Sequence, residues 1–505
     1  MPAPIIGIDL GTTNSCAAYV DKSGEVVLIP YRGGEFIVPS IYAVDERGNE
    51  LVGHEAKRQW QLNPHNTIFG AKRLVGTNID SALVNEMRRH VGYEMQAGGD
   101  GDVVIPVAGQ SLALHEIAGK ILQKIRDVAS SHLGEPVGRA VVTVPAYFND
   151  RQRQAVYRAG KAIDLDILRI INEPTAAALA YGARENTHQT IAIYDLGGGT
   201  FDISVIEIRG RIFEVKATGG DIFLGGIDFD NALIQFILAD FNSKNDIDLE
   251  SDAVAMQRIR DLAERVKIDL SERKEVPVSI PFVTMAADGK PLDISLTVSR
   301  EEFELLTEHL VEKTFVTVAQ VVDDAGMTPD QIQEVLLVGG QTRMPLIRER
   351  IREFFGREPS KGVHPDEAVA IGAALYAWSL EEYSDLKLQL LDVLPMAIGI
   401  EAAGGKLHKL FERNTSVPNR KVFTFTTHED DQHDLAMRLF QGDSEDVANN
   451  TLLGEFTFTG LRPGPAGSVR VEVVFDVNGE GILALDARDT ETQAMMQQTI
   501  HLAAD

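Results

Sequence analysis

The chain has 505 residues and a net charge of −27, with 44% hydrophobic and 24% charged residues. A chain of this length is too long for one hydrophobic core, so we expect about two to four domains. The composition is that of a folded protein and argues against both disorder and a membrane protein. Because 75 acidic residues outnumber 48 basic ones and no basic run offsets them, nucleic acid is not an expected partner.

The N-terminal segment and the cysteine content predict a cytoplasmic location without a membrane partner. Residues 1–10 have no basic region ahead of their apolar stretch, and no apolar run of about 18 residues follows in the sequence. The single cysteine, Cys16, cannot form an internal disulfide, which is typical of a reducing compartment. We expect Cys16 to be a small buried strand residue.

The first 380 residues or so follow an α/β pattern. Short β-branched segments at residues 5–10, 141–144 and 191–196 alternate with segments of helical periodicity. A second block of the same kind ends in a strand at residues 335–338 and a helix at residues 365–380. This alternation predicts an α/β fold.

The pattern changes after Tyr383. Residues 384–393 form a short leucine-bearing segment, and beyond it apolar residues recur almost wholly with a period of two, as in Val469, Val471 and Val473. The Asn478-Gly479 pair between apolar runs predicts a β-hairpin. We therefore expect a domain boundary here, followed by an all-β unit with a sandwich architecture.

One internal repeat carries more information than any single segment. Residues 8–13 read Ile-Asp-Leu-Gly-Thr-Thr and residues 194–200 read Tyr-Asp-Leu-Gly-Gly-Gly-Thr. Glycines let the backbone N–H groups of a turn approach phosphate oxygens, and an aspartate can hold Mg²⁺ through its water shell. Two copies predict two opposed turns that close on the phosphates of a nucleotide. The alternative is two ordinary glycine turns with capping aspartates.

Five longer motifs carry a family resemblance. They read Ile-Asp-Leu-Gly-Thr-Thr-Asn-Ser (8–15), Val-Pro-Ala-Tyr-Phe-Asn-Asp (144–150), Ile-Asn-Glu-Pro-Thr-Ala-Ala-Ala-Leu-Ala-Tyr-Gly (171–182), Asp-Leu-Gly-Gly-Gly-Thr-Phe-Asp (195–202) and Leu-Val-Gly-Gly-Gln-Thr-Arg-Met-Pro (337–345). In this order they resemble the heat shock protein 70 family of DnaK-like molecular chaperones. The resemblance covers essentially the whole chain, whereas the P-loop and Rossmann signatures are absent from it.

The resemblance implies a domain plan. It predicts an actin-like (ribonuclease H-like) two-lobed α/β ATPase domain at 1–383 with lobes at 1–184 and 185–383, a linker at 384–393, and a β-sandwich peptide-binding domain at 394–505. The family continues into a helical lid, whereas this sequence stops at Asp505. We therefore expect a short form without the lid, which releases peptide quickly in both nucleotide states.

The resemblance also implies a Mg²⁺-dependent ATPase site for ATP and ADP, with K⁺ as a further ion. The expected catalytic residues are Asp9, Lys72, Glu173, Asp195 and Thr200, and the expected metal-binding residues are Asp9, Asp195 and Asp202. The expected nucleotide-binding residues are Gly11, Thr12, Thr13, Asn14, Gly197, Gly198, Gly199, Gly225, Gly226, Glu264, Lys267, Ser271, Gly339, Gly340 and Arg343. Lys72 would stabilise the charge that develops on the γ-phosphate.

Spacing bears on two of these assignments. Glu264, Lys267 and Ser271 lie at i, i+3 and i+7, so they share one helix face that can hydrogen-bond a ribose. On spacing alone, a surface ion pair is the alternative. Glu173 precedes Pro174 at the expected start of a helix, where a carboxylate stays ionised. It would orient the attacking water or coordinate Mg²⁺, and it can cap the helix at the same time.

Communication between the domains is expected to use the linker and a few residues of the ATPase. The expected allosteric residues are Pro145, Arg153, Leu388, Leu390, Leu391 and Asp392. Gln389 stands where the family usually has an apolar residue, so it must find a partner, and we expect weaker linker docking than in typical members. Arg169, Asn172, Thr175 and Asp392 match positions that receive J-domain co-chaperones, and a GrpE-type nucleotide exchange factor is a further expected partner.

The all-β unit is expected to hold extended hydrophobic segments of unfolded proteins. The expected peptide-binding residues are Ile400, Ala403, Phe425, His428, Leu435, Met437 and Val471. On burial statistics alone, the apolar members would be core residues. Ala403 and His428 match an arch over the bound backbone, and a histidine there predicts peptide binding that changes with pH near neutrality.

The resulting hypothesis is an ATP-dependent chaperone that couples peptide binding to ATP hydrolysis in protein folding and stress response. One alternative is a specialised regulatory or client-dedicated ATPase of the same family. An actin-like small-molecule kinase or a filament protein is the other, because one fold serves several functions. A kinase would have no use for residues 394–505, and a filament protein would not need the leucine linker.

Overall fold

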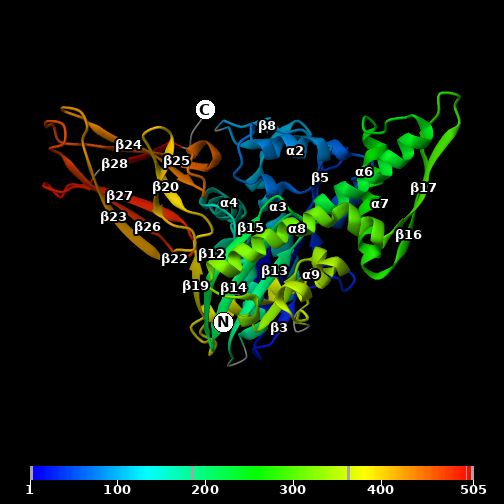
Figure 1. The fold of residues 1–505 in the computed structure, drawn as a ribbon, viewed down its shortest axis with the longest axis horizontal. Coiled ribbons are helices and arrows are strands. Elements are labelled where there is room, and N and C mark those ends of the chain that lie inside the picture. Colours follow the sequence, from blue (N-terminus) through cyan, green and yellow to red (C-terminus); the bar gives the residue numbers. More distant parts are fainter. Residues whose placement is uncertain (1–3, 100, 184–186, 361–363, 496, 502–505) are drawn as a thin grey trace.

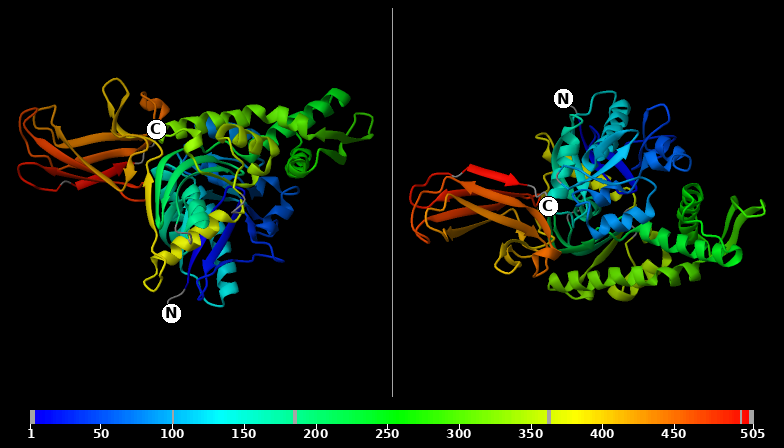
Figure 2. Two further views of the ribbon diagram at one scale, coloured as in Figure 1. Left: turned by 60° about the horizontal axis from the view of Figure 1, so that its bottom comes forward. Right: turned by 90° about the horizontal axis from the view of Figure 1, so that it is seen from above.

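The computed structural model describes residues 4–99, 101–183, 187–360, 364–495 and 497–501. The predicted boundary between the lobes, at residues 184 and 185, lies outside these ranges. Two α/β lobes form the centre of the molecule, with a β-sandwich at one end of the long axis and a β-hairpin at the other (Figures 1 and 2). None of the helices in these ranges has the length and apolar character that crossing a membrane requires.

The first lobe is built around one mixed sheet. Its elements are β1 (Ile5–Asp9), β2 (Asn14–Val20), β3 (Val26–Leu28), β4 (Ile37–Pro39), β5 (Tyr42–Val44), β6 (Glu50–Val52), α1 (His54–Gln59), η1 (Pro64–Asn66), β7 (Thr67–Ile68), η2 (Ala71–Leu74), α2 (Ala82–His90), β8 (Gln96–Ala97), β9 (Val103–Val107), β10 (Gln110–Ala113), α3 (Leu114–Leu133), β11 (Arg139–Val144), α4 (Asp150–Lys161), β12 (Asp166–Asn172) and α5 (Glu173–Gly182). The strand order is β12-β11-β1-β2-β3, with β4 paired to β2. Cys16 is buried on β2, as predicted.

The second lobe repeats this plan. Its elements are β13 (His188–Leu196), β14 (Phe201–Arg209), β15 (Ile212–Asp221), α6 (Gly226–Asn245), α7 (Ala253–Glu272), β16 (Glu275–Met285), β17 (Pro291–Ser299), α8 (Arg300–Asp324), η3 (Pro329–Gln331), β18 (Glu334–Val338), η4 (Gly340–Arg343), α9 (Pro345–Phe355) and α10 (Ala368–Leu380). β13 lies parallel to β18 and antiparallel to β14, just as β1 lies parallel to β11 and antiparallel to β2. Asp9 and Asp195 therefore occupy equivalent places in two similar sheets.

Two small-residue helices hold the lobes together at their base. α5 and α10 are in backbone contact, since a Cβ on Gly372 would lie 1.7 Å from the carbonyl oxygen of Ala176. α10 also lies against β1, because a Cβ on Gly7 would come within 2.1 Å of the backbone nitrogen of Ala374. These close approaches leave no room for larger side chains and fix the spacing of the two sheets.

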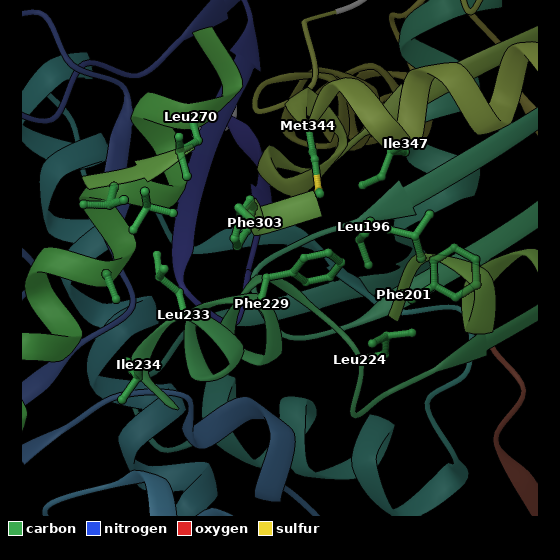
Figure 3. Close-up of a cluster of buried hydrophobic side chains, with 14 of the residues drawn as sticks. Leu196, Phe201, Leu224, Phe229, Leu233, Ile234, Leu270, Phe303, Met344 and Ile347 are labelled. Atoms are coloured by element: carbon green, nitrogen blue, oxygen red, sulfur yellow. The ribbon is translucent and has the colours of Figure 1, made fainter. Parts of the chain in front are cut away.

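A hydrophobic core of the second lobe supports one of the glycine turns (Figure 3). Leu196 and Phe201, the residues that flank the turn, are fully buried in it. Phe229 and Leu233 of α6 and Ile347 of α9 belong to the same core. The turn between β13 and β14 therefore begins and ends on rigidly packed side chains.

The linker extends the sheet of the second lobe. β19 (Gln389–Val393) pairs in parallel with β15. Leu388 and Leu390 pack against the core beneath that sheet, whereas Gln389 is exposed and its backbone N–H donates to the Arg211 carbonyl at 3.0 Å. The expectation that Gln389 must find a partner is therefore wrong, because strand alternation turns its side chain to solvent. The prediction of weaker linker docking rested on this expectation and therefore loses its support.

Residues beyond the linker form two facing sheets. Their elements are β20 (Ile398–Ala402), β21 (Lys406–Phe411), β22 (Ser416–Val417), β23 (Asn419–Thr426), β24 (Asp434–Gln441), η5 (Val447–Asn449), β25 (Thr451–Thr459), β26 (Arg470–Val477), β27 (Leu483–Asp489) and β28 (Gln497–His501). One sheet has the order β21-β20-β24-β25-β28 and the other β23-β26-β27. β26 and β27 form the hairpin predicted at Asn478, with a loop at residues 478–482 in which Gly481 takes the positive φ of 76°.

Candidate functional site

The two glycine turns of the internal repeat touch each other across the lobes. A Cβ on Gly198 would lie 1.9 Å from Thr13 Oγ1, and one on Gly199 would lie 2.4 Å from Thr12 Cγ2. No side chain larger than glycine fits such distances. The contact leaves the backbone N–H groups of both turns at one place between the lobes, where they can bind an anion.

A cleft with a volume of about 750 Å³ lies between the lobes at these turns. Eighteen of the residues predicted from the sequence line it, namely Asp9, Gly11, Thr12, Thr13, Asn14, Lys72, Glu173, Asp195, Gly197, Gly198, Thr200, Gly226, Glu264, Lys267, Ser271, Gly339, Gly340 and Arg343. Gly199, Gly225 and Asp202 lie behind this lining. Gly225 packs on the Gly199 backbone, where a Cβ would come within 2.5 Å, and Asp202 is buried beside Asp195 on the neighbouring strand.

Lys72 and Glu173 form an ion pair beside the turns. Lys72 lies in η2 of the first lobe, and its Nζ is 2.7 Å from Glu173 Oε1 at the first residue of α5. The two side chains are only 10% and 9% exposed. Each charge depends on the other for compensation, so a ligand that enters must offer new partners to both.

Three buried carboxylates surround this pair. Burial raises the pKa of Asp9 to about 7 and that of Asp202 to about 8, and it raises the pKa of Asp195 well above its usual range. The negative charge of Glu173 adds to each of these pKa shifts. Such carboxylates favour a nearby cation, which would lower their pKa values again.

The donor set fits a hydrated cation. In the part of the chain that the structure describes, no three His, Cys, Asp or Glu side chains are placed to ligate a metal directly. Mg²⁺ usually keeps several of its waters and binds through few protein carboxylates, with substrate phosphates completing its shell. Asp9 and Asp195 line the cleft, so they are placed to accept hydrogen bonds from such waters.

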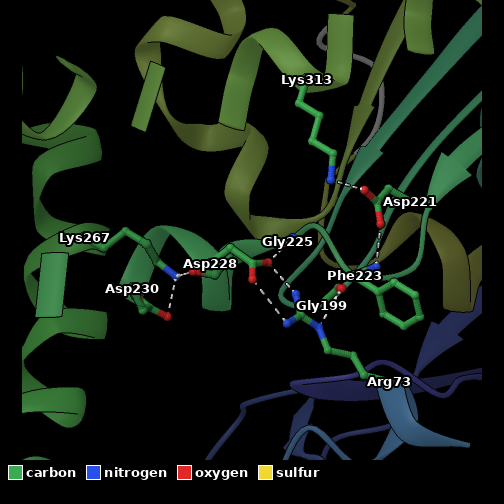
Figure 4. Close-up of polar contacts among 10 residues, drawn as sticks. Arg73, Gly199, Asp221, Phe223, Gly225, Asp228, Asp230, Lys267 and Lys313 are labelled. Atoms are coloured by element: carbon green, nitrogen blue, oxygen red, sulfur yellow. Dashed lines mark hydrogen bonds and ion pairs between the residues drawn. The ribbon is translucent and has the colours of Figure 1, made fainter. Parts of the chain in front are cut away.

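The cleft-facing side of α7 carries the predicted polar face. Lys267 Nζ donates to the Gly226 carbonyl and to Asp230 Oδ2, both at 2.9 Å (Figure 4). Glu264 is paired with Lys57 of the first lobe at 3.0 Å. Glu264 and Lys267 are therefore not an ion pair with each other, which is the alternative that their spacing left open.

A further part of the cleft is formed by η4 and its neighbours. Gly339 has a positive φ of 84°, and a Cβ there would lie 2.4 Å from the Leu196 carbonyl oxygen. Arg343 is held by Asp366, with Nη2 and Oδ2 2.6 Å apart. Ile268 also lines the cleft, although its side chain is largely exposed. It is an apolar part of the cleft that reasoning from the polar face of α7 missed.

Sequence reasoning also missed Arg73, which joins the two lobes (Figure 4). Its side chain is only 3% exposed, and its Nε donates to the Gly199 carbonyl at 2.8 Å. Its Nη2 pairs with Asp228 Oδ2 at 2.6 Å, and the same oxygen accepts the Gly225 N–H at 2.8 Å. Its position next to Lys72 was the only signal in the sequence.

Comparison with protein families settles the relationship of the chain. A family model described as Hsp70 protein matches residues 5–505. The chain belongs to the Hsp70 family. The family combines an actin-like ATPase fold with a β-sandwich, and its members are chaperones with ATPase activity that bind ATP or ADP with Mg²⁺. They generally bind unfolded polypeptides and work with J-domain and nucleotide exchange partners.

The residues that resemble the coupling positions of Hsp70 proteins form a chain of contacts. Arg153 Nη2 donates to Asn172 Oδ1 at 2.8 Å, and Asn172 Nδ2 donates to Asp392 Oδ2 of the linker at 2.9 Å. Thr175 reaches the same carboxylate oxygen at 3.2 Å. Asn172 directly precedes Glu173 in the sequence, so the linker contact lies next to the ion pair of the cleft.

A second connection starts at Asp202. Its Oδ1 accepts the backbone N–H of Tyr147 at 3.2 Å, in the segment between β11 and α4. Pro145 lies in the same segment, and the Phe148 carbonyl accepts a hydrogen bond from Arg153 at 3.1 Å. Movement of the buried carboxylate would therefore reach the linker contacts through this segment.

In the Hsp70 chain the sandwich also docks directly on the two α/β lobes. Glu480 is buried between Tyr157, whose hydroxyl donates to it, and Arg169, whose Nη1 lies 3.2 Å away. On the far side of the interface, Arg413 is paired with Asp324 at 3.0 Å. Arg169 was matched to a J-domain position, and here it contacts the sandwich.

The predicted peptide residues separate into two groups. Met437 and Val471 are buried in the sandwich core, and Ile400, Phe425 and Leu435 pack at its edge, half-buried. Ala403 and His428 are exposed in the loops after β20 and β23. The structure thus brings the five apolar residues together and leaves the two arch residues in separate loops, with His428 Nε2 3.6 Å from Glu429.

Proposed function

We propose that this protein is a Mg²⁺-dependent ATPase that acts as a chaperone for extended hydrophobic segments of unfolded proteins. The observation that carries the proposal is the buried Lys72–Glu173 ion pair, placed beside two touching glycine turns in an interlobe cleft. Turn N–H groups, a lysine and a positioned carboxylate are the parts that phosphoryl transfer to water requires. Family membership supports the same reaction.

The residues divide the work of hydrolysis. The turns at Gly11–Asn14 and Gly197–Thr200 bind the phosphates through their N–H and hydroxyl groups. Lys72 stabilises the charge that develops on the transferred phosphoryl group, and Glu173 orients the attacking water. Asp9 and Asp195, with Asp202 behind them, would hold Mg²⁺, which would supply neutralisation of phosphate charge there. K⁺ is a further proposed ion at the same carboxylates.

The structural change caused by nucleotide binding is proposed to be transmitted to the sandwich through Glu173 and Asp202. Glu173 directly follows Asn172 in the sequence, and Asp202 is connected to Arg153 through the Tyr147–Phe148 segment. Asp392 belongs to the strand that carries Leu390 and Leu391. The five apolar residues around Met437 are the proposed peptide pocket, with Ala403 and His428 over it. Sensitivity of peptide binding to pH through His428 stays a prediction.

Partners are proposed from family membership and from the surface. A J-domain partner would use Arg169, Asn172, Thr175 and Asp392, which lie where the linker and the sandwich meet the first lobe. A nucleotide exchange partner would act by opening the lobes. A J-protein that leaves the ATPase rate unchanged when it binds would remove the first of these proposals.

The test is hydrolysis of ATP by the full chain in the presence and absence of Mg²⁺. We expect turnover that needs Mg²⁺ and is lost in Glu173→Gln, while binding of a labelled ADP persists in that variant. Glu50→Gln is the matched control, because Glu50 pairs with Lys120 on the surface, away from the cleft. Equal hydrolysis in Glu173→Gln and the control would overturn the proposal.

A further inference from the structure

The cleft continues beyond the residues assigned to the nucleotide. Along α7, its lining runs from Arg260 to Glu272, which is a rise of about 18 Å. The face predicted to bind ribose, from Glu264 to Ser271, accounts for only about 10 Å of this rise. Arg260 lies one helical turn further toward the start of α7, and nothing in the proposed ATPase mechanism uses it.

Apolar side chains from both lobes line this end of the cleft, which we call the interlobe chamber. Its lining residues are Trp60, Phe69 and His90 of the first lobe and Ile227, Ile234 and Arg260 of the second. Trp60 and Phe69 pack together with ring centroids 4.5 Å apart. Two aromatic rings and two isoleucines make a surface for an apolar body rather than for phosphates.

Two hydrogen-bond donors of the chamber have no protein partner. Trp60 Nε1 is buried without a hydrogen bond, and within the described ranges Arg260 makes neither a hydrogen bond nor an ion pair. Burial lowers the pKa of Arg260, with no acidic neighbour to offset it. A buried donor without a partner, such as Trp60 Nε1, costs stability, and the half-buried guanidinium of Arg260 has no carboxylate to pair with. An acceptor supplied by a ligand would remove this cost.

The acidic residues nearest to Arg260 on α7 are engaged elsewhere. Glu264 is paired with Lys57 at 3.0 Å, and Asp261 Oδ2 accepts a hydrogen bond from Gln61 Nε2 at 2.6 Å. Both contacts join the α1 region to α7, so they hold the lobes together next to the chamber. Asp230, which lies between Ile227 and Ile234 on α6, is paired with Lys267 at 2.9 Å. Arg260 is therefore left without a carboxylate partner beside an apolar wall.

We propose that the interlobe chamber binds a small organic anion, with an aromatic or aliphatic body and a carboxylate, next to the bound nucleotide. The body would lie against Trp60 and Phe69, and the carboxylate would pair with Arg260. Because such a ligand contacts both lobes, it stabilises their closed arrangement and slows nucleotide release. By linkage, bound nucleotide must strengthen binding of the anion by the same factor.

A titration with 3-phenylpropanoate tests the chamber, with its neutral amide as the matched probe. The full chain is saturated with ADP and Mg²⁺ and carries Trp378→Phe, so that Trp60 is its only tryptophan. We expect a saturable change in Trp60 emission with the carboxylate and at least tenfold weaker binding of the amide, because a hydrogen bond to a charged group contributes about 1.5–3 kcal/mol. Equal binding of the two probes overturns the proposal.

Variants locate the bound probe. Arg260→Gln should weaken binding of 3-phenylpropanoate about tenfold or more, and Arg260→Lys should retain part of the affinity. Arg265→Gln, whose side chain on the same helix is 68% exposed, should leave it unchanged. Unaltered affinity in Arg260→Gln contradicts the proposal, as does displacement of the probe by ADP, which would place it in the nucleotide site.

Nucleotide release provides an independent readout. We expect 3-phenylpropanoate to slow the release of labelled ADP in the wild-type chain but not in Arg260→Gln, and unchanged release in both would overturn the proposed closure. The titration does not depend on hydrolysis. If the chain binds no ADP, the proposed ATPase fails, but the same titration of the nucleotide-free protein still decides whether the chamber binds the probe.

Discussion

The interlobe cleft and the junction between the lobes and the sandwich join their parts by different interactions. At the cleft, touching glycine turns and the Arg73–Asp228 ion pair join the lobes, beside the buried Lys72–Glu173 pair of the first lobe. The junction uses a strand ladder between β15 and β19, half-buried leucines and a hydrogen-bonded Asp392, together with the Arg169–Glu480 and Arg413–Asp324 ion pairs. Paired charges suit the proposed anion site of the cleft, because an entering anion can replace one partner of a pair. The β15–β19 ladder lies at the edge of a sheet, where a contact between domains can form and separate.

The largest effect should come from breaking the charge pair of the cleft. Lys72→Met removes the cation next to the glycine turns, and loss of one such electrostatic partner typically lowers the rate about 10²–10³-fold. We expect that loss in single-turnover ATP hydrolysis. Lys120→Met, which removes a surface pair with Glu50, is the control and should change the rate less than about twofold. A hydrolysis rate of Lys72→Met within tenfold of wild type would contradict the proposed role of Lys72 in the cleft.

The Arg73–Asp228 pair should matter next. Arg73→Gln leaves Asp228 without its cation and the Gly199 carbonyl without a donor, so we expect a loss of about 3 kcal/mol in the free energy of unfolding of the two α/β lobes. Faster release of labelled ADP should accompany it. The double variant with Asp228→Asn should recover part of the loss.

A matched surface pair sharpens the same prediction. Lys313 and Asp221 are 2.6 Å apart, but Lys313 is 61% exposed, so Lys313→Gln should cost less than about 0.5 kcal/mol (Figure 4). Calorimetry of Arg73→Gln and Lys313→Gln compares the two losses in the free energy of unfolding. Equal losses would mean that burial does not set the value of these pairs.

The junction should respond to leucines and not to Gln389. Leu390→Ala removes apolar contact with the core below the sheet, and we expect a loss of about 1–1.5 kcal/mol in linker docking, or about tenfold faster hydrogen exchange across β19. Gln389→Val should leave exchange within about twofold, because the side chain is exposed. Strong protection gained in Gln389→Val would restore the view that this glutamine weakens docking.

The smallest effect is a pH dependence set by Asp230. Burial raises its pKa from 3.8 to about 6, so between these values the folded protein holds a proton that the unfolded chain has lost. Stability therefore falls as pH rises through this window, by about 1 kcal/mol between pH 5 and pH 7. Asp230→Asn should reduce the slope in thermal unfolding by that amount, while the raised pKa values of Asp9, Asp195 and Asp202 maintain the rest. An unchanged slope would show that Asp230 titrates normally.

The parts that sequence could predict are those in which backbone geometry dictates the residue. The Asp9 and Asp195 turns need glycines because they touch, and Glu173 begins its helix where its motif indicated. The strands and helices that the sequence analysis named lie within a few residues of their predicted positions, because hydrophobic periodicity is a local property of the sequence.

What sequence could not predict depends on contacts between distant segments. Arg73 pairs with a residue 155 positions away, and no periodic pattern marks such a partner. Arg260 is one more polar residue on a helix until the opposite wall of the cleft is known. Gln389 was placed wrongly because its exposure depends on which face of β19 packs on the lobe, and the linker sequence alone does not determine that face.

The most direct test of the whole account is single-turnover ATP hydrolysis by the full chain with and without an extended apolar peptide. If the cleft and the sandwich are coupled through Asn172 and Asp392, saturating peptide should raise the rate several-fold, and Asp392→Ala should abolish the increase while keeping the basal rate. Hydrolysis that peptide leaves unchanged would contradict the coupling and leave an ATPase and a sandwich that act independently.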